Sequence, residues 1–144
     1  MAGLPGCGVG GDEPTPLDLM HVPSDSLGPV AAGTRVFRNI ADWTAFWNAH
    51  PYPNPLGVVT APAVDFGRHA VAGVFAGAKP RCQSLQIHAG ERQGSVVTLR
   101  WRIVTFGQAT PSSCIGSDMF TFNLADLVLV PADAAELRFI QETA

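Results

Sequence analysis

The sequence has little charge, no long apolar run and no basic cluster. Charged residues make up 15% of its 144 residues, below the roughly 25% of an average soluble domain. It contains no run of about 18 apolar residues, the length that a membrane-spanning helix needs. The nine cations are scattered and the net charge is −3, whereas nucleic-acid binding needs a clustered basic surface. We therefore expect no nucleic-acid partner.

The sequence also lacks the local motifs of metal binding and catalysis. Its four histidines form no HxH or HxxxH pair, and its three cysteines form no CxxC pair. No G-x-S-x-G nucleophile elbow is present, and neither the lysine nor the helix of a phosphate-binding loop follows the glycine-rich residues 8–11. Asp65 and Asp118 both lie in turn-like segments, where aspartate commonly bonds the backbone rather than acting as an acid or base. We expect a non-catalytic protein without a metal or cofactor.

Apolar residues make up 47% of the chain, which is enough for the core of one domain. Residues 1–33 are rich in glycine, proline, serine and aspartate and show no lasting apolar period, which predicts a flexible linker. Residues 34–144 are predicted to form a single, mainly β domain.

Cys7 closes a short motif within the predicted linker. Leu4-Pro5-Gly6-Cys7 resembles the lipobox of bacterial lipoproteins, in which a leucine stands three positions before an acylated cysteine. Pro5 departs from the usual small residue, and the charged and apolar signal regions are not seen before the motif. If Cys7 is acylated, the linker tethers the domain to a membrane through a lipid; the alternative is an ordinary exposed cysteine.

One helix is predicted after residue 39. Asn39 has an N-cap side chain, Asp42 adds a favourable negative charge in the first turn, and Pro51 ends the helix. One face carries apolar and aromatic residues at helical spacing: Ile40, Trp43, Phe46, Trp47 and His50. This spacing favours a helix that packs on a sheet over an aromatic ligand platform.

The rest of the domain shows the alternation and the turn signals of short strands. Strands are predicted at residues 35–38, 84–88, 95–104, 120–123, 126–130 and 137–141, with turns at 77–80 and 90–94. Residues 64–66 and 69–75 are predicted to form two strands or one bent strand. Residues 70–75 are continuously apolar and are expected to be central. The pattern predicts a mainly β fold at the margin of α+β, with antiparallel sheets in a β-sandwich or partly closed barrel and the helix on one side.

Cys82 and Cys114 are predicted to form a disulfide. The bridge would close a loop of about thirty residues between two predicted strands and stabilise the domain by roughly 3 to 4 kcal/mol. Because disulfides persist in oxidising compartments, we expect an extracytoplasmic protein, whether periplasmic, cell-surface or secreted. A catalytic or metal-binding thiol is the alternative.

The order of features over residues 34–141 resembles the PrcB-type family, the carboxy-terminal domain of a protease complex subunit found in exported bacterial proteins. The resemblance is carried by Asn39-Ile40, Asp42-Trp43, Phe46-Trp47, Pro62, Val64-Asp65-Phe66, residues 71–77, Lys79-Pro80 and residues 126–131. It covers roughly three quarters of the chain. The family tends to a Thr-Gly-Gly-Tyr turn where this sequence has Arg81-Cys82-Gln83-Ser84, so a partner-binding role of that turn does not carry over.

The resemblance implies a non-catalytic, often lipid-anchored subunit that binds or stabilises an exported protease, and it implies no cofactor. The residues that we nominate for partner binding are Lys79, Arg81, Gln83, Arg100, Arg102, Ser117 and Asp118. Arg100 and Arg102 alternate onto one strand face, which suits either a small anion or carboxylate site or a solvated polar face. The alternative functions are a direct protease inhibitor of β-sandwich type and a small metal-binding or thiol-dependent enzyme that uses Cys114, Asp118, Met119 and a histidine brought to them by the fold.

Overall fold

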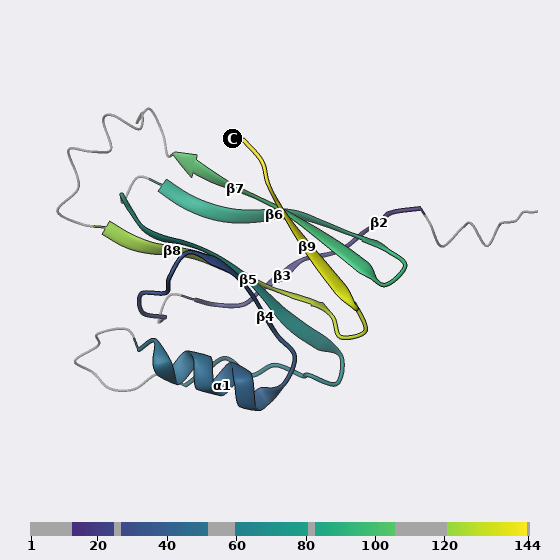
Figure 1. Ribbon diagram of the computed structural model, residues 1–144, viewed down its shortest axis with the longest axis horizontal. Helices are drawn as coiled ribbons and strands as arrows, with labels where there is room; N and C mark the ends of the chain where they lie inside the picture. The colour runs from purple at the N-terminus through teal and green to yellow at the C-terminus, as the bar shows by residue number, and fades with distance from the viewer. Residues whose placement is uncertain (1–12, 25–26, 52–59, 81–82, 106–120, 144) are drawn as a thin grey trace, which may run out of the picture.

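In the described part of the chain, two four-stranded sheets and one helix stack in three layers (Figure 1). The computed structural model describes residues 13–24, 27–51, 60–80, 83–105 and 121–143. The outer sheet has the strand order β2 (Thr15–Pro16), β6 (Gln83–Gln93), β7 (Val96–Thr105) and β9 (Glu136–Gln141). The central sheet has the order β3 (Met20–His21), β8 (Thr121–Pro131), β5 (His69–Pro80) and β4 (Gly33–Phe37). The helix α1 (Ile40–Ala49) lies on the other face of the central sheet, so the predicted β-sandwich with one helix is confirmed.

The central sheet is apolar on both faces because it lies between the outer sheet and the helix. In β5, Ala70, Ala72 and Val74 belong to the core between the sheets. The alternate residues Val71 and Phe75 belong to the core beneath the helix. Strand geometry sends successive side chains to opposite faces, which is why a continuously apolar run marks the strand with neighbours on both sides.

The helix is held by its cap and by aromatic packing. The side-chain oxygen of Asn39 accepts the N–H of Asp42 at 2.8 Å, as predicted for an N-cap. Trp43 is fully buried, and its ring lies 5.2 Å from that of Phe37 on β4. Ile40 was predicted on the buried face but is 59% exposed, because it is the first helical residue and lies one turn before Trp43. No helix in the described residues has the length and apolarity needed to cross a membrane.

Three local predictions are wrong, each because a backbone feature replaces the expected element. Residues 77–80 do not turn the chain: β5 continues to Pro80, and a register shift between Phe75 and Gly77 makes a bulge in which Gly77 has φ +76°. Residues 64–66 form no strand, because Asp65 starts a turn in which its carboxylate accepts the N–H of Gly67 at 3.0 Å. The turn expected over residues 90–94 is shorter, since β6 continues to Gln93 and pairs there with β7.

The last strand also breaks the expected antiparallel pattern. β9 runs parallel to β7, with Val96 opposite Glu136 and Trp101 opposite Gln141. The chain reaches this position by leaving the central sheet at Pro131 and crossing to the edge of the outer sheet. Every other strand pair is antiparallel among the described residues.

Residues 13–24 form an N-terminal strap across both sheets, so the linker prediction fails for this part of residues 1–33. β2 pairs with β6, and the N–H of Leu17 donates to the carbonyl of Gly90 at 2.9 Å. β3 then pairs with β8, and the N–H of Val22 donates to the carbonyl of Leu127 at 2.8 Å. Main-chain pairing at the edges of two sheets orders a segment whose composition alone is typical of a linker (Figure 1).

Candidate functional site

The structure places some of the nominated residues and leaves others outside the described residues. Cys7, Arg81, Cys82, Cys114, Ser117, Asp118 and Met119 lie outside them, so the predicted disulfide and the lipid site stay predictions. Lys79 lies on β5 opposite Phe122, and the half-buried Gln83 begins β6 opposite Thr105. Arg100 and Arg102 lie on β7, one of the two inner strands of the outer sheet.

Both segments that contain the inner cysteines join the described fold at one end of the sandwich. β5 and β8 pair there through Pro80 and Thr121, and β6 and β7 pair through Gln83 and Thr105. The strand ends that flank residues 81–82 and 106–120 therefore lie on the same side of the molecule (Figure 1). These are the end of β5, the start of β6, the end of β7 and the start of β8.

Arg100 is the centre of an ion-pair network on the solvent-facing side of the outer sheet. Its guanidinium lies 3.1 Å from Glu91 and 3.4 Å from Glu142, and the other carboxylate oxygen of Glu142 lies 2.6 Å from Nε2 of His88. The hydrogen bond to Glu91 is the main reason that the pKa of Arg100 is raised above its ordinary value. The guanidinium already holds two carboxylates of this chain, so Arg100 is poorly suited to recruit a third.

Arg102 lies two positions further along β7 and has no such partner. Its Nε atom is buried and makes no hydrogen bond with any described residue. The hydroxyl of Ser84, on the neighbouring strand β6, is buried and without a partner in the same way. Buried polar groups are nearly always hydrogen-bonded, so two such atoms on neighbouring strands stand out as lacking a hydrogen-bond partner.

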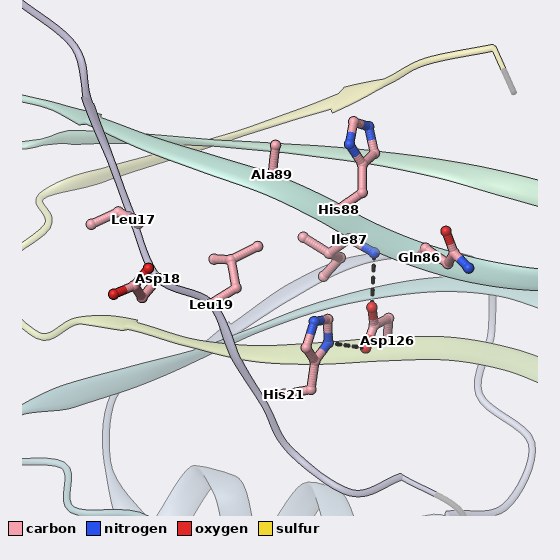
Figure 2. Close-up of a pocket in the computed structure, with 9 residues that line it drawn as sticks. All are labelled: Leu17, Asp18, Leu19, His21, Gln86, Ile87, His88, Ala89 and Asp126. Atoms are coloured by element: carbon pink, nitrogen blue, oxygen red, sulfur yellow. Dashed lines mark hydrogen bonds and ion pairs between the residues drawn. The ribbon is translucent and has the colours of Figure 1, made fainter.

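A second candidate site is a pocket of about 490 Å³ between the N-terminal strap and β6. Its described lining comprises Leu17, Asp18, Leu19, His21, Gln86, Ile87, His88, Ala89 and Asp126 (Figure 2). Nδ1 of His21 lies 2.9 Å from the carboxylate of Asp126, and the other carboxylate oxygen accepts the main-chain N–H of Ile87 at 2.8 Å. His88 projects to the other side of β6, away from Asp126.

The carboxylate of Asp126 acts as a structural tie in this pocket. Both oxygens of Asp126 are engaged, one by the strap and one by the outer sheet. The lining residues include no serine, threonine, cysteine, tyrosine or lysine that would serve as a nucleophile. Over the described residues, no group of three or more histidine, cysteine, aspartate or glutamate side chains is arranged to hold a metal ion.

The sequence reasoning missed His21 and Asp126, although one signal for Asp126 was present. The residues of β8 alternate between the two cores, and Leu124, Val128 and Val130 face the outer sheet. Asp126 has the same parity, which makes it a carboxylate at an inward position of an apolar strand. Such a residue requires a hydrogen-bond partner, and Ile87 supplies it. No comparable signal marked His21, because it lay in the predicted linker.

No family model, curated protein or solved structure matches this chain. The resemblance to the PrcB-type family therefore stays a prediction. The fold defines the class of protein: a mainly β sandwich with one helix packed on its central sheet.

Proposed function

We propose that the protein is a non-catalytic, extracytoplasmic binding module that binds or stabilises an exported protein, with an exported protease as the partner. In this proposal Cys7 carries a lipid that tethers the module to a membrane. The protease, the location and the tether are predictions from the sequence, and an uncovered sheet face in the fold supports the proposal of a binding surface.

The observation that carries the proposal is the unequal covering of the two sheets. The central sheet is covered on one side by α1 and on the other by the outer sheet. Among the described residues, secondary-structure elements pack on the inner side of the outer sheet, and no described helix or strand lies over its other face (Figure 1). We name this surface the free face; it is made by the outward residues of β6, β7 and β9.

The free face combines charge with an exposed apolar side chain, as binding surfaces of globular proteins commonly do. Ile140 on β9 is 39% exposed and stands directly opposite Arg100 in the β7–β9 register. Arg100, with its paired carboxylates Glu91 and Glu142, lies beside it, and Arg102 lies two residues further along β7. β9 is also the last strand of its sheet, and no described strand pairs with its other side, so its backbone is open to a partner strand.

A pull-down with two matched variants tests the proposal. Ile140→Asp places a charge on the free face, and Met20→Asp places the same charge on the strap, where Met20 is 61% exposed. We expect the wild-type protein and Met20→Asp to recover the same exported protease from solubilised membranes, and Ile140→Asp to recover at least about ten-fold less.

Thermal unfolding of both variants checks that each is folded. Equal recovery with Ile140→Asp, or recovery of no protease at all, contradicts the proposal. Assays of the recovered protease with and without the protein distinguish stabilisation from direct inhibition. A longer lifetime of the protease supports stabilisation, and loss of its activity supports direct inhibition.

A further inference from the structure

We propose that Arg102 and Ser84 form a receptor for one carboxylate group presented by the partner protein. The inference rests on the proposed function, because it names the chemistry by which the free face recognises its partner. It concerns a part of that face outside the network centred on Arg100.

The register of the outer sheet brings the two residues together. Gln86 stands opposite Arg102, and Ser84 stands opposite Val104, so Ser84 and Arg102 are diagonal neighbours on adjacent strands. Such neighbours lie about 7–8 Å apart at the backbone, within reach of an arginine side chain. Leu85 and Ile87 face the core between the sheets, which places the alternate residue Ser84 on the free face.

The other arginines of the outer sheet show what Arg102 lacks. Arg92 lies 2.9 Å from Asp133, Arg100 lies 3.1 Å from Glu91, and Arg138 lies 2.6 Å from Glu136. Arg102 is the remaining arginine of this sheet, and it holds no carboxylate of the described residues. Nε of Arg102 and Oγ of Ser84 are both buried without a hydrogen-bond partner. An acceptor that reaches them would therefore gain two hydrogen bonds and remove the cost of two unsatisfied buried donors.

A carboxylate fits these donors better than a more highly charged anion. Nε and one terminal nitrogen of a guanidinium bind the two oxygens of a carboxylate side by side, and a serine hydroxyl adds a third donor. Glu142 follows β9 next to Trp101, so a doubly charged phosphate at Arg102 would meet a nearby negative charge. Because Nε is covered in the structure, the carboxylate enters as the half-buried side chain of Arg102 changes rotamer.

Acetate is the first probe, because it is small enough to enter a covered site. We expect the Nε–H signal of Arg102 in a nitrogen–proton NMR spectrum of the full chain to shift saturably with sodium acetate. The corresponding signals of Arg92, Arg100 and Arg138 serve as internal controls with carboxylate partners of their own. Ser84→Ala is expected to weaken acetate binding by about ten-fold or more, the effect of one hydrogen bond to a charged group.

Arg102→Lys keeps the positive charge but removes Nε, so we expect it to abolish the saturable binding that the backbone amides of β7 report. Arg138→Gln is the matched control on the same sheet and should leave binding unchanged. No shift of Arg102 at saturating acetate, or an equal shift of all four arginines, overturns the inference.

Peptides and inorganic phosphate then identify the source of the carboxylate. An end-blocked peptide with one internal glutamate presents a side chain, and a peptide without acidic residues but with a free carboxy terminus presents a main-chain carboxylate. Tighter binding of phosphate than of both peptides overturns the choice of a carboxylate.

The receptor and the proposed function fail in different ways. If acetate binds at Arg102 but the pull-down recovers no partner, the proposed function fails and the site remains. If the pull-down recovers a protease equally well with wild type and Arg102→Lys, the receptor fails and the binding module remains.

Discussion

The carboxylate of Asp126 accepts the main-chain N–H of Ile87 at 2.8 Å and thereby joins the two sheets of the sandwich. Asp126 lies on β8 of the central sheet, and Ile87 lies on β6 of the outer sheet, next to a bulge that separates it from Ala89 in register. The bulge disturbs the strand pairing, and the side chain of Asp126 satisfies the Ile87 N–H. The same carboxylate holds His21 of the strap, so three segments distant in sequence meet at one side chain.

Replacing Asp126 should therefore destabilise the fold in proportion to the acceptors removed. Asp126→Leu leaves the N–H of Ile87 without an acceptor, and we expect the free energy of unfolding to fall by about 2–3 kcal/mol in urea titrations. Asp126→Asn keeps one acceptor oxygen and should lose about 1 kcal/mol. A leucine variant as stable as the wild type would show that this contact contributes nothing.

Two glycines of β5 should respond to alanine substitution for different reasons. A Cβ at Gly73 would collide with the Leu127 side chain and come within 3.0 Å of the Phe75 ring, so Gly73→Ala should cost about 1–3 kcal/mol by overpacking. A Cβ at Gly77 meets nothing closer than 3.9 Å, but its φ of +76° disfavours alanine, so Gly77→Ala should cost about 1 kcal/mol.

Denaturant titrations of both glycine variants give the comparison. Removing the Leu127 side chain makes space beside Gly73 and should rescue only that variant. Gly73→Ala combined with Leu127→Ala should lose less free energy of unfolding than the sum of the two single changes, whereas Gly77→Ala should add its full cost to that of Leu127→Ala. Additive costs at Gly73 would contradict the packing explanation.

The Arg92–Asp133 ion pair predicts a small acid-dependent loss of stability. The hydrogen bond from Arg92 is the main cause that lowers the pKa of Asp133 below its ordinary value. A group with a lowered folded pKa contributes stability above its unfolded pKa and loses it as the pH falls through the folded one. The loss should therefore occur below about pH 4, and it should be small because Asp133 is largely exposed.

Melting temperatures measured between about pH 5 and pH 2 test this effect. Asp133→Asn should show a shallower acid-dependent decrease than the wild type, with little change at neutral pH. Parallel profiles of melting temperature against pH for the two proteins would mean that the Arg92–Asp133 ion pair does not contribute to the pH dependence of stability.

The predicted disulfide between Cys82 and Cys114 is checked by thiol counting. In protein that has never been reduced, neither cysteine should react with a thiol reagent until the chain is unfolded with a reductant. Reduction should lower the free energy of unfolding by roughly 3 to 4 kcal/mol, the value for a loop of about thirty residues. If both thiols react in the native protein, the disulfide prediction is wrong and the thiol-dependent alternative gains support.

Patterns that depend on the local sequence predicted their elements well. The Asn39 cap and the Trp43-Phe46-Trp47 spacing specified the helix, and the alternation through Val97 and Leu99 specified β7. These elements are specified by side chains near one another in sequence. The continuous apolar run of β5 likewise predicted that this strand lies in the interior of a sheet.

The elements that the sequence did not reveal depend on distant partners. Leu17 and Leu19 show one step of apolar alternation, which is too short to predict a strap that pairs with β6 and β8. His21 and Asp126 are 105 positions apart, and only the register of β3 and β8 brings them together. The nominated Arg100 and Arg102 looked equivalent as alternate residues, but Glu91 and Glu142 distinguish them in the fold.

Site-specific photo-crosslinking tests the central claim, that the free face binds an exported partner, most directly. One variant carries the crosslinking residue at position 140 on the free face, and the control carries it at position 40 on α1, where Ile40 is 59% exposed. Irradiation of intact cells should join the protein to one exported protease from position 140 and not from position 40. Crosslinks to that protease only from position 40, or equal crosslinks from both positions, would contradict the claim.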